Sequence, residues 1–101
     1  MEKVGWRNLL QETIKELKQH SKPLQEVLFV CDDKHYASWE WFVENADFEY
    51  NCFRAGINSE LKVVGKDWWL ERAEYDGSGW WEFKTLPLIK GKVTNPFKLR
   101  S

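Results

Sequence analysis

The spacing of apolar residues predicts a helix near the beginning of the chain. Leu10, Ile14 and Leu17 recur at steps of four and three residues, and the opposite positions carry charged side chains. This pattern is typical of an amphipathic helix, which we place over residues 5–20. Pro23 predicts the end of the helix, because proline disfavours helical geometry in the residue before it.

Two short strands are predicted after this helix. Residues 25–31 are apolar on both faces, which is typical of a central strand. The polar segment at 32–34 is a turn signal. Residues 35–37 can then return as a short antiparallel strand.

A second helix is predicted over residues 39–46, with Ser38 suited to cap its first turn. An alternating strand through the same residues competes with this interpretation. We favour the helix because residues 44–47 are poor strand formers. Residues 48–60 show no clear period, so a loop that packs against the protein is expected there.

Residues 61–64, 67–75 and 80–86 predict a three-stranded antiparallel meander. A two-residue turn at 65–66 would place Val64 opposite Asp67. A second turn within residues 76–79 would place Tyr75 opposite Trp80, Glu71 opposite Lys84 and Leu70 opposite Thr85. The fold class expected from all these elements is α+β, with the helices packed on the sheet.

Both turns predict the same two faces for the meander, because neighbouring residues of a strand point to opposite sides. One face is apolar: Leu61, Val63, Trp68, Leu70, Trp81 and Phe83. The other face mixes aromatic and charged side chains: Lys62, Trp69, Glu71, Ala73, Tyr75, Trp80, Glu82 and Lys84. The agreement of two independent turns supports a real sheet.

Composition adds seven tryptophans in 101 residues, which is enough aromatic surface for a small core. The length predicts one domain, 1–101, divided into the helix 5–20, a strand–turn–strand–helix segment 25–47, the meander 61–87 and a tail 88–101. Without a long apolar run or an apolar leader, we expect a cytoplasmic protein with no membrane contact.

Charge is unevenly distributed along the chain. Residues 31–60 hold seven acidic and two basic side chains, whereas residues 83–101 hold five basic and no acidic ones. The basic tail is expected to add a short edge strand around residues 88–92. A mixed solvated surface, an acidic patch for a basic partner and a tail that contacts phosphate are all compatible with this pattern.

Residues capable of chemistry are few, and we expect no catalytic site, metal or cofactor. Cys31, Asp32, Asp33, His35 and Ser38 cluster in the sequence, but aspartates are ordinary turn residues. The spacing of the ligand-type residues does not match a zinc site: Cys31, Cys52, His20 and His35. We expect both cysteines to be free thiols in the core. Gly77-Ser78-Gly79 lacks the context of a phosphate-binding loop and is interpreted as a hairpin tip.

One long motif resembles a known family. The stretch from Asp67 to Pro87, with its core Trp-Trp-Leu-Glu-Arg-Ala-Glu-Tyr-Asp-Gly-Ser-Gly-Trp-Trp-Glu-Phe-Lys, is similar to small uncharacterised phage and prophage proteins of Gram-positive bacteria. The segments Tyr36–Glu40 and Ala46–Tyr50 also resemble that family, so the likeness covers residues 25–87. It implies a viral or mobile-element origin and supplies no activity.

The functional hypothesis is a non-enzymatic accessory protein that binds another macromolecule, such as a host-defence protein. The expected interaction surface is the mixed face of the meander: Trp69, Tyr75, Trp80, Glu71 and Lys84. Charged side chains are rarely fully buried, so this face should be partly wet. The alternative is that helix 5–20 covers it. A nucleic-acid-binding module, a virion assembly protein and a homo-oligomer also stay open as hypotheses.

Overall fold

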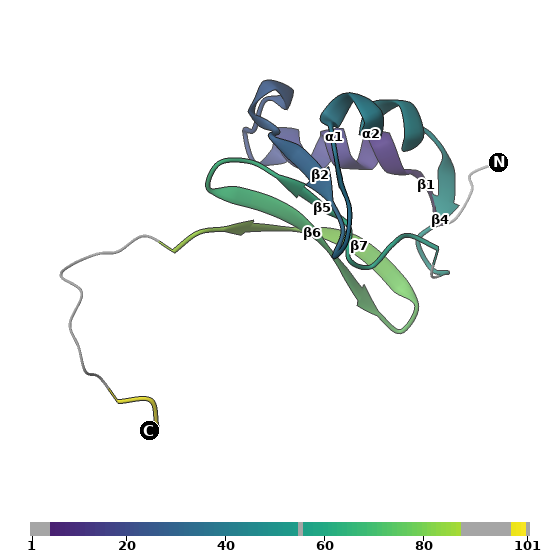
Figure 1. Cartoon of the computed structure of the whole chain (residues 1–101). Coiled ribbons are helices and arrows are strands. Elements are labelled where there is room, and N and C mark those ends of the chain that lie inside the picture. Colours follow the sequence, from purple (N-terminus) through teal and green to yellow (C-terminus); the bar gives the residue numbers. More distant parts are fainter. Residues whose placement is uncertain (1–4, 55, 88–97, 101) are drawn as a thin grey trace.

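The computed structural model of the chain describes residues 5–54, 56–87 and 98–100 (Figure 1). The helices are α1 (Leu9–Gln19), α2 (Trp39–Asn45) and a 3₁₀-helix (Leu24–Glu26). The strands are β1 (Trp6–Asn8), β2 (Phe29–Cys31), β3 (Tyr36–Ala37), β4 (Glu49–Asn51), β5 (Lys62–Val64), β6 (Trp68–Tyr75) and β7 (Ser78–Thr85). The fold class is α+β, as predicted. The edge strand expected around 88–92 lies outside the described residues.

The first helix is shorter than predicted, because its first residues form a strand. Strand β1 pairs with β4, with Arg7 opposite Tyr50. Asn8 then caps α1, since its side-chain oxygen accepts a hydrogen bond from the Gln11 backbone N–H at 3.0 Å. The helix ends before Ser21, whose φ of 56° lies in the left-handed region that terminates helices.

The prediction of a loop over 48–60 was wrong in part, because β4 lies within it. Its partner β1 is about forty residues away in sequence, a separation at which no local pattern reveals pairing. Residues 25 and 26, predicted as strand, belong to the 3₁₀-helix instead. Helix α2 is confirmed, and the Ser38 side chain accepts a hydrogen bond from the Trp41 backbone N–H at 3.1 Å.

Five strands form one antiparallel sheet in the order β3-β2-β5-β6-β7. Strand β2 has a neighbour on each side, in keeping with its two apolar faces. The row Val30, Val63, Leu70 and Phe83 crosses the sheet from β2 to β7. The predicted meander is therefore the larger part of a single sheet that β2 and β3 complete.

Both predicted hairpin registers were wrong by two residues. Val63 pairs with Leu70, because a four-residue turn closes with the Gly65 backbone N–H donating to the Trp68 carbonyl at 2.8 Å. The indole of Trp68 lies so close above Gly65 that a Cβ there would collide with it. A shift of two residues exchanges partners but leaves every side chain on its predicted face.

The second turn is Asp76-Gly77, where both residues have positive φ (52° and 84°), as a type I′ hairpin requires. Tyr75 consequently pairs with Ser78 and not with Trp80. Glu71 faces Glu82 and not Lys84. The Asp-Gly pair is the strongest short hairpin signal in this segment, and it predicts the observed turn better than Gly77-Ser78 does.

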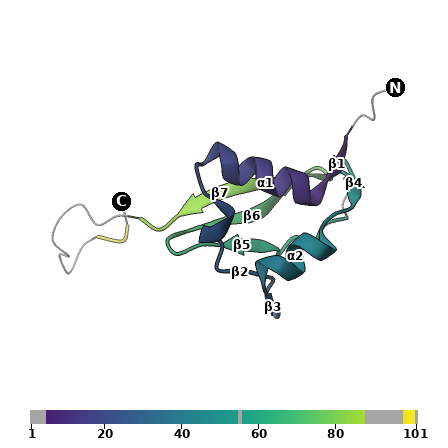
Figure 2. The same ribbon diagram turned by 90° about the horizontal axis from the view of Figure 1, so that it is seen from above.

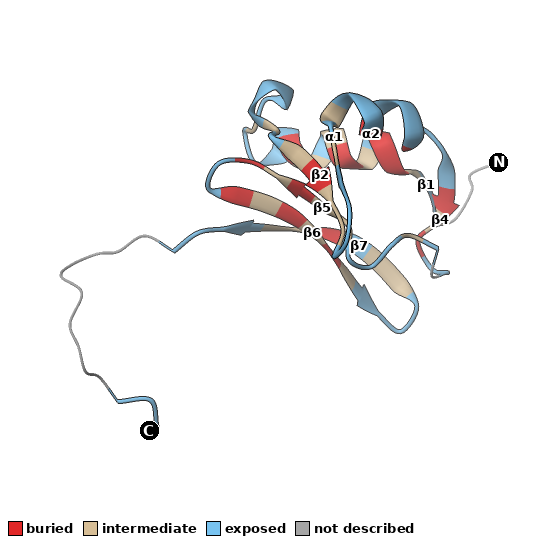
Figure 3. Ribbon diagram, in the orientation of Figure 1, coloured by how far each residue is buried: buried red, intermediate tan, exposed pale blue. Residues whose placement is uncertain are grey.

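Both helices lie on the same side of the five-stranded sheet (Figures 1 and 2). The core between them and the sheet contains Leu9, Leu10, Leu17, Val30, Phe42, Ala46, Tyr50, Cys52, Val63, Trp68, Leu70 and Trp81. Figure 3 shows the buried residues gathered between these layers. No described element covers the opposite side of the sheet, so the alternative in which the first helix covers it was wrong.

Candidate functional site

The uncovered side of the sheet, called the open face below, carries the surface predicted for interaction. By strand pairing it consists of Phe29, Cys31, Tyr36, Lys62, Val64, Trp69, Glu71, Ala73, Tyr75, Ser78, Trp80, Glu82 and Lys84. Tyr75 is 78% exposed and Trp80 39% exposed, whereas Trp69 is partly buried among its neighbours. The five residues predicted for the surface therefore do share one face.

Pairing brings two carboxylates together in the middle of the open face. Glu71 and Glu82 lie directly opposite each other on β6 and β7. Like charges in this position destabilise a sheet, by roughly 0.2–1 kcal/mol. Glu71 accepts a hydrogen bond from the Trp69 indole N–H at 2.6 Å, and Lys84 lies 3.6 Å from Glu82. Lys62 is the neighbour of Glu71 on β5. The centre of this face therefore holds two carboxylates that face each other, each with a lysine nearby.

Two aromatic residues of the open face lie outside the predicted surface. Phe29 and Tyr36 pack edge to face, with ring centroids 5.5 Å apart. Phe29 continues the row of Val64 and Trp69 across the sheet. Alternation within 25–31 could have placed Phe29 on one face, but only the pairing of β2 with β5 shows that this face is the open one.

The covered side contrasts with the open face, because its polar groups form a closed network. The Arg72 side chain is almost fully buried and donates to Glu12 Oε1 at 3.0 Å. The Tyr50 hydroxyl donates to the same oxygen at 2.6 Å. Burial, together with this bond to Glu12, raises the pKa of Tyr50 to about 12. The Arg72 guanidinium lies 4.9 Å from the Trp81 ring centroid, close enough for a cation–π contact.

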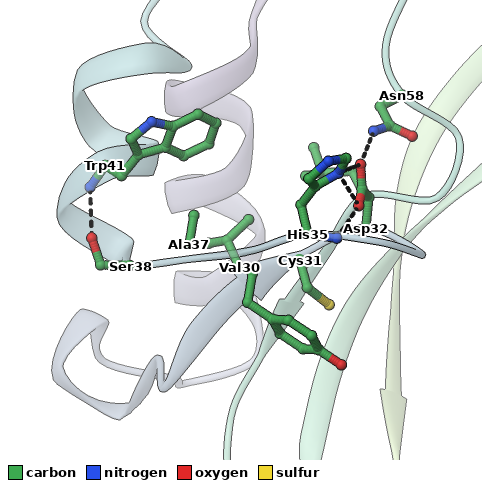
Figure 4. Close-up of a pocket in the computed structure, with 10 residues that line it drawn as sticks. Val30, Cys31, Asp32, His35, Ala37, Ser38, Trp41 and Asn58 are labelled. Carbon is green, nitrogen blue, oxygen red and sulfur yellow. Dashed lines mark hydrogen bonds and ion pairs between the residues drawn. The ribbon is translucent and has the colours of Figure 1, made fainter.

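A hollow with a volume of about 590 Å³ lies beside the turn between β2 and β3 (Figure 4). It is lined by Val30, Cys31, Asp32, His35, Tyr36, Ala37, Ser38, Trp41, Asn58 and Leu61. Four of the five residues that cluster in the sequence thus line one hollow. Asp33 is exposed at the turn.

Asp32 holds this turn together through hydrogen bonds. Its carboxylate accepts the backbone N–H groups of Lys34 at 2.9 Å and His35 at 2.7 Å, the His35 ring at 3.0 Å and the Asn58 amide at 3.0 Å. These bonds, that from Lys34 foremost, lower the pKa of Asp32 to about 2. Asp32 is therefore a turn residue, as interpreted from the sequence.

The nucleophile candidates beside this turn are not placed for catalysis. Ser38 Oγ accepts the Trp41 N–H as a helix cap. Burial raises the pKa of the Cys31 thiol, which disfavours the nucleophilic thiolate. The Cys31 sulfur points away from the His35 ring in Figure 4. The hollow is therefore lined by the hydrogen-bonded pair of Asp32 and His35, but neither Cys31 nor Ser38 is activated as a nucleophile beside this pair.

Among the described residues, no three histidine, cysteine or acidic side chains gather as metal ligands would. Cys31 and Cys52 are both free thiols. Cys52 is buried in the core as expected, but the expectation was wrong for Cys31, which is only partly buried because it lies on the open face opposite Lys62. None of the described helices has the length and apolar character needed to cross a bilayer.

Comparison of the chain with models of known protein families, with curated protein sequences and with solved structures finds no match.

Proposed function

We propose that this chain is a non-enzymatic binding protein that uses the open face to hold a partner protein. The observation that carries the proposal is the uncovered face itself, with Trp80 and Tyr75 exposed on the paired strands β6 and β7. Large exposed apolar patches on soluble proteins usually mark interaction sites. The resemblance of residues 25–87 to phage and prophage proteins supports an accessory role in that setting.

The charges of the open face favour a partner that brings basic groups. Glu71 and Glu82 face each other without a base between them, and an arginine or lysine of the partner would relieve their repulsion. Trp69 and Trp80 lie on either side of this pair along the strands and offer ring faces to the same cation. The partner is therefore expected to present an apolar surface that contains at least one arginine or lysine.

Nucleic acid fits this surface less well. Bases could stack on Trp80 or Tyr75, but their phosphates would approach the carboxylates of Glu71 and Glu82. The chain as a whole is slightly acidic, with a net charge of −1, and does not have the basic footprint typical of nucleic-acid binders.

Capture from a bacterial lysate with matched variants tests the proposal. The full chain, its Trp69→Ala and Trp80→Ala variants and a Trp41→Ala control are each immobilised, with and without nuclease treatment. Trp41 is 51% exposed but lies on α2, away from the open face. We expect a protein band that survives nuclease, weakens in raised salt and is lost only with the two open-face variants.

The opposite results would overturn this function. A band retained by both open-face variants would place binding elsewhere on the molecule. Loss of the captured material after nuclease treatment would favour the nucleic-acid alternative.

A further inference from the structure

Strand β7 is an edge of the five-stranded sheet, and part of its backbone points away from β6. The Gly79 N–H points outward, because it donates to the Cys52 carbonyl at 2.9 Å. Backbone groups alternate in direction along a strand, so those of Trp81, Phe83 and Thr85 point outward too. None of these three has a backbone partner across this edge within the described residues. A free edge of this kind is a template for another strand.

The open-face side chains of β7 and the residue after it form a self-complementary series. Trp80, Glu82, Lys84 and Leu86 read as apolar, acidic, basic, apolar. When two copies of this series pair in antiparallel orientation, each apolar residue faces an apolar residue and each charged residue faces one of opposite charge. Trp80 and Leu86 are both exposed, so two apolar side chains stand at the ends of a charged pair.

We propose that two copies of the chain associate through β7, antiparallel, with Phe83 on the two-fold axis. In this register Glu82 faces Lys84 of the second copy, and Trp80 faces Leu86 of the second copy. The outward backbone groups of Trp81 and Thr85 then meet across the seam as a hydrogen-bonded pair. The strand that pairs with the free edge is thus β7 of a second copy, because Glu82 and Lys84 of the two copies face each other with opposite charge.

Other registers of the same edge lose this complementarity. Moving the axis by one residue places Glu82 opposite Glu82, or Lys84 opposite Lys84, and such pairs repel. Moving it by two residues places a charged side chain opposite Trp80 or Leu86 and removes both ion pairs. The Phe83-centred register is therefore favoured over its neighbours.

The surroundings of the edge fit such a pairing. Between α1 and β7 lies a hollow of about 180 Å³, whose lining includes Lys15, Glu16, Gln19 and Trp80. A two-fold axis perpendicular to the sheet keeps both open faces on one side of the dimer. The dimer would join them into one continuous surface with two equivalent binding regions.

Sedimentation velocity of the full chain over a series of concentrations tests the pairing. We expect a dimer for the wild type. Glu82→Lys and Lys84→Glu each set like charges against each other at two positions, which should weaken association by about tenfold or more. An equimolar mixture of these two variants restores opposite charges at every position, and so should associate as the wild type does.

Two further variants control for indirect effects. Lys62→Glu reverses a charge on the open face in the inner strand β5, and it should leave association unchanged. Thr85→Pro removes an outward N–H while sparing the β6–β7 ladder, and it should abolish the dimer.

A wild type that stays monomeric at all concentrations would overturn the proposal. So would single charge variants that associate normally, or a mixture of them that fails to associate. The result is separable from the proposed function, since a monomer that still captures a protein through Trp80 refutes only the pairing of β7.

Discussion

The two sides of the five-stranded sheet differ although the same strands build them. On the covered side, Trp68, Leu70 and Arg72 of β6 are buried, and the Arg72 guanidinium is paired with Glu12. On the open side, Glu71 faces Glu82 directly, the exposed ion pair between Lys84 and Glu82 is 3.6 Å long, and the rings of Tyr75 and Trp80 reach water. The comparison indicates that the covered side contributes most of the packing stability, whereas the open side keeps a pair of facing carboxylates and exposed aromatic rings.

Adjacent tryptophans of β7 offer the strongest test of this difference. Trp81 is 5% exposed and its indole N–H donates to the Thr13 hydroxyl at 3.0 Å, whereas Trp80 is 39% exposed. We expect Trp81→Ala to lower the free energy of unfolding by about 3–5 kcal/mol. Trp80→Ala should cost about 1 kcal/mol or less, because the ring is only partly removed from water. Urea titration of both variants measures the two values, and equal losses would mean that Trp80 belongs to the core.

Leu70 is the next most informative position on the covered side. It is fully buried between Val63 and Phe83, so truncation leaves a cavity as well as losing apolar contact. Leu70→Ala should lower the free energy of unfolding by roughly 2–5 kcal/mol. Val64→Ala, one strand away on the open face, is the matched control and should cost less. A loss below about 0.5 kcal/mol for Leu70→Ala would contradict the placement of this face.

Removal of the charge that balances Arg72 should have a smaller effect. Glu12→Gln keeps the size of the side chain but leaves the guanidinium buried with a neutral partner. The loss of a hydrogen bond to a charged group corresponds to about 1.5–3 kcal/mol. Glu82→Gln on the open face should be neutral or slightly stabilising, because it removes the repulsion from Glu71. Thermal unfolding of both variants measures whether Glu12→Gln lowers the stability while Glu82→Gln leaves it unchanged or raises it.

The smallest effect concerns the protonation of Tyr50. Its pKa is raised to about 12, so the folded state holds the phenol proton more tightly than the unfolded chain does, where the pKa is about 10. The corresponding stability is present below about pH 10 and is lost as the pH rises toward 12. Absorbance titration of phenolate should therefore show one late step near pH 12. Tyr50→Phe should lack that step, and its persistence in the variant would assign it to another tyrosine.

The faces of the meander were predictable from the sequence, whereas its registers were not. Alternation within β5, β6 and β7 is a local property, and it placed Leu70, Trp81 and Trp69 on the correct sides. Register depends on where each turn closes. At the first turn, the Trp68 indole fills the space in which a Cβ on residue 65 would lie, so only glycine fits there, and this contact is visible only in three dimensions. The error of two residues left the faces intact because the side-chain period is also two.

For the candidate site, the sequence identified five residues that share the open face, but it did not identify Phe29 and Tyr36. Their place depends on the pairing of β2 with β5, between segments more than thirty residues apart. The facing carboxylates of Glu71 and Glu82 likewise follow from the observed register. Contacts of this kind are not encoded in any local period, so pattern analysis cannot supply them.

The sequence by itself determined the α+β class, the main helix and strand segments and the two faces of the meander, because these follow from periodicity, caps and turn residues within a few positions. Only the tertiary structure decided that β1 joins β4, that β2 completes the sheet and that both helices cover the same side. Those outcomes depend on which distant apolar surfaces bury one another best, and that is a property of the whole packed chain. The open face exists because α1 and α2 both lie on the side of Trp81, which leaves Trp80 to the solvent.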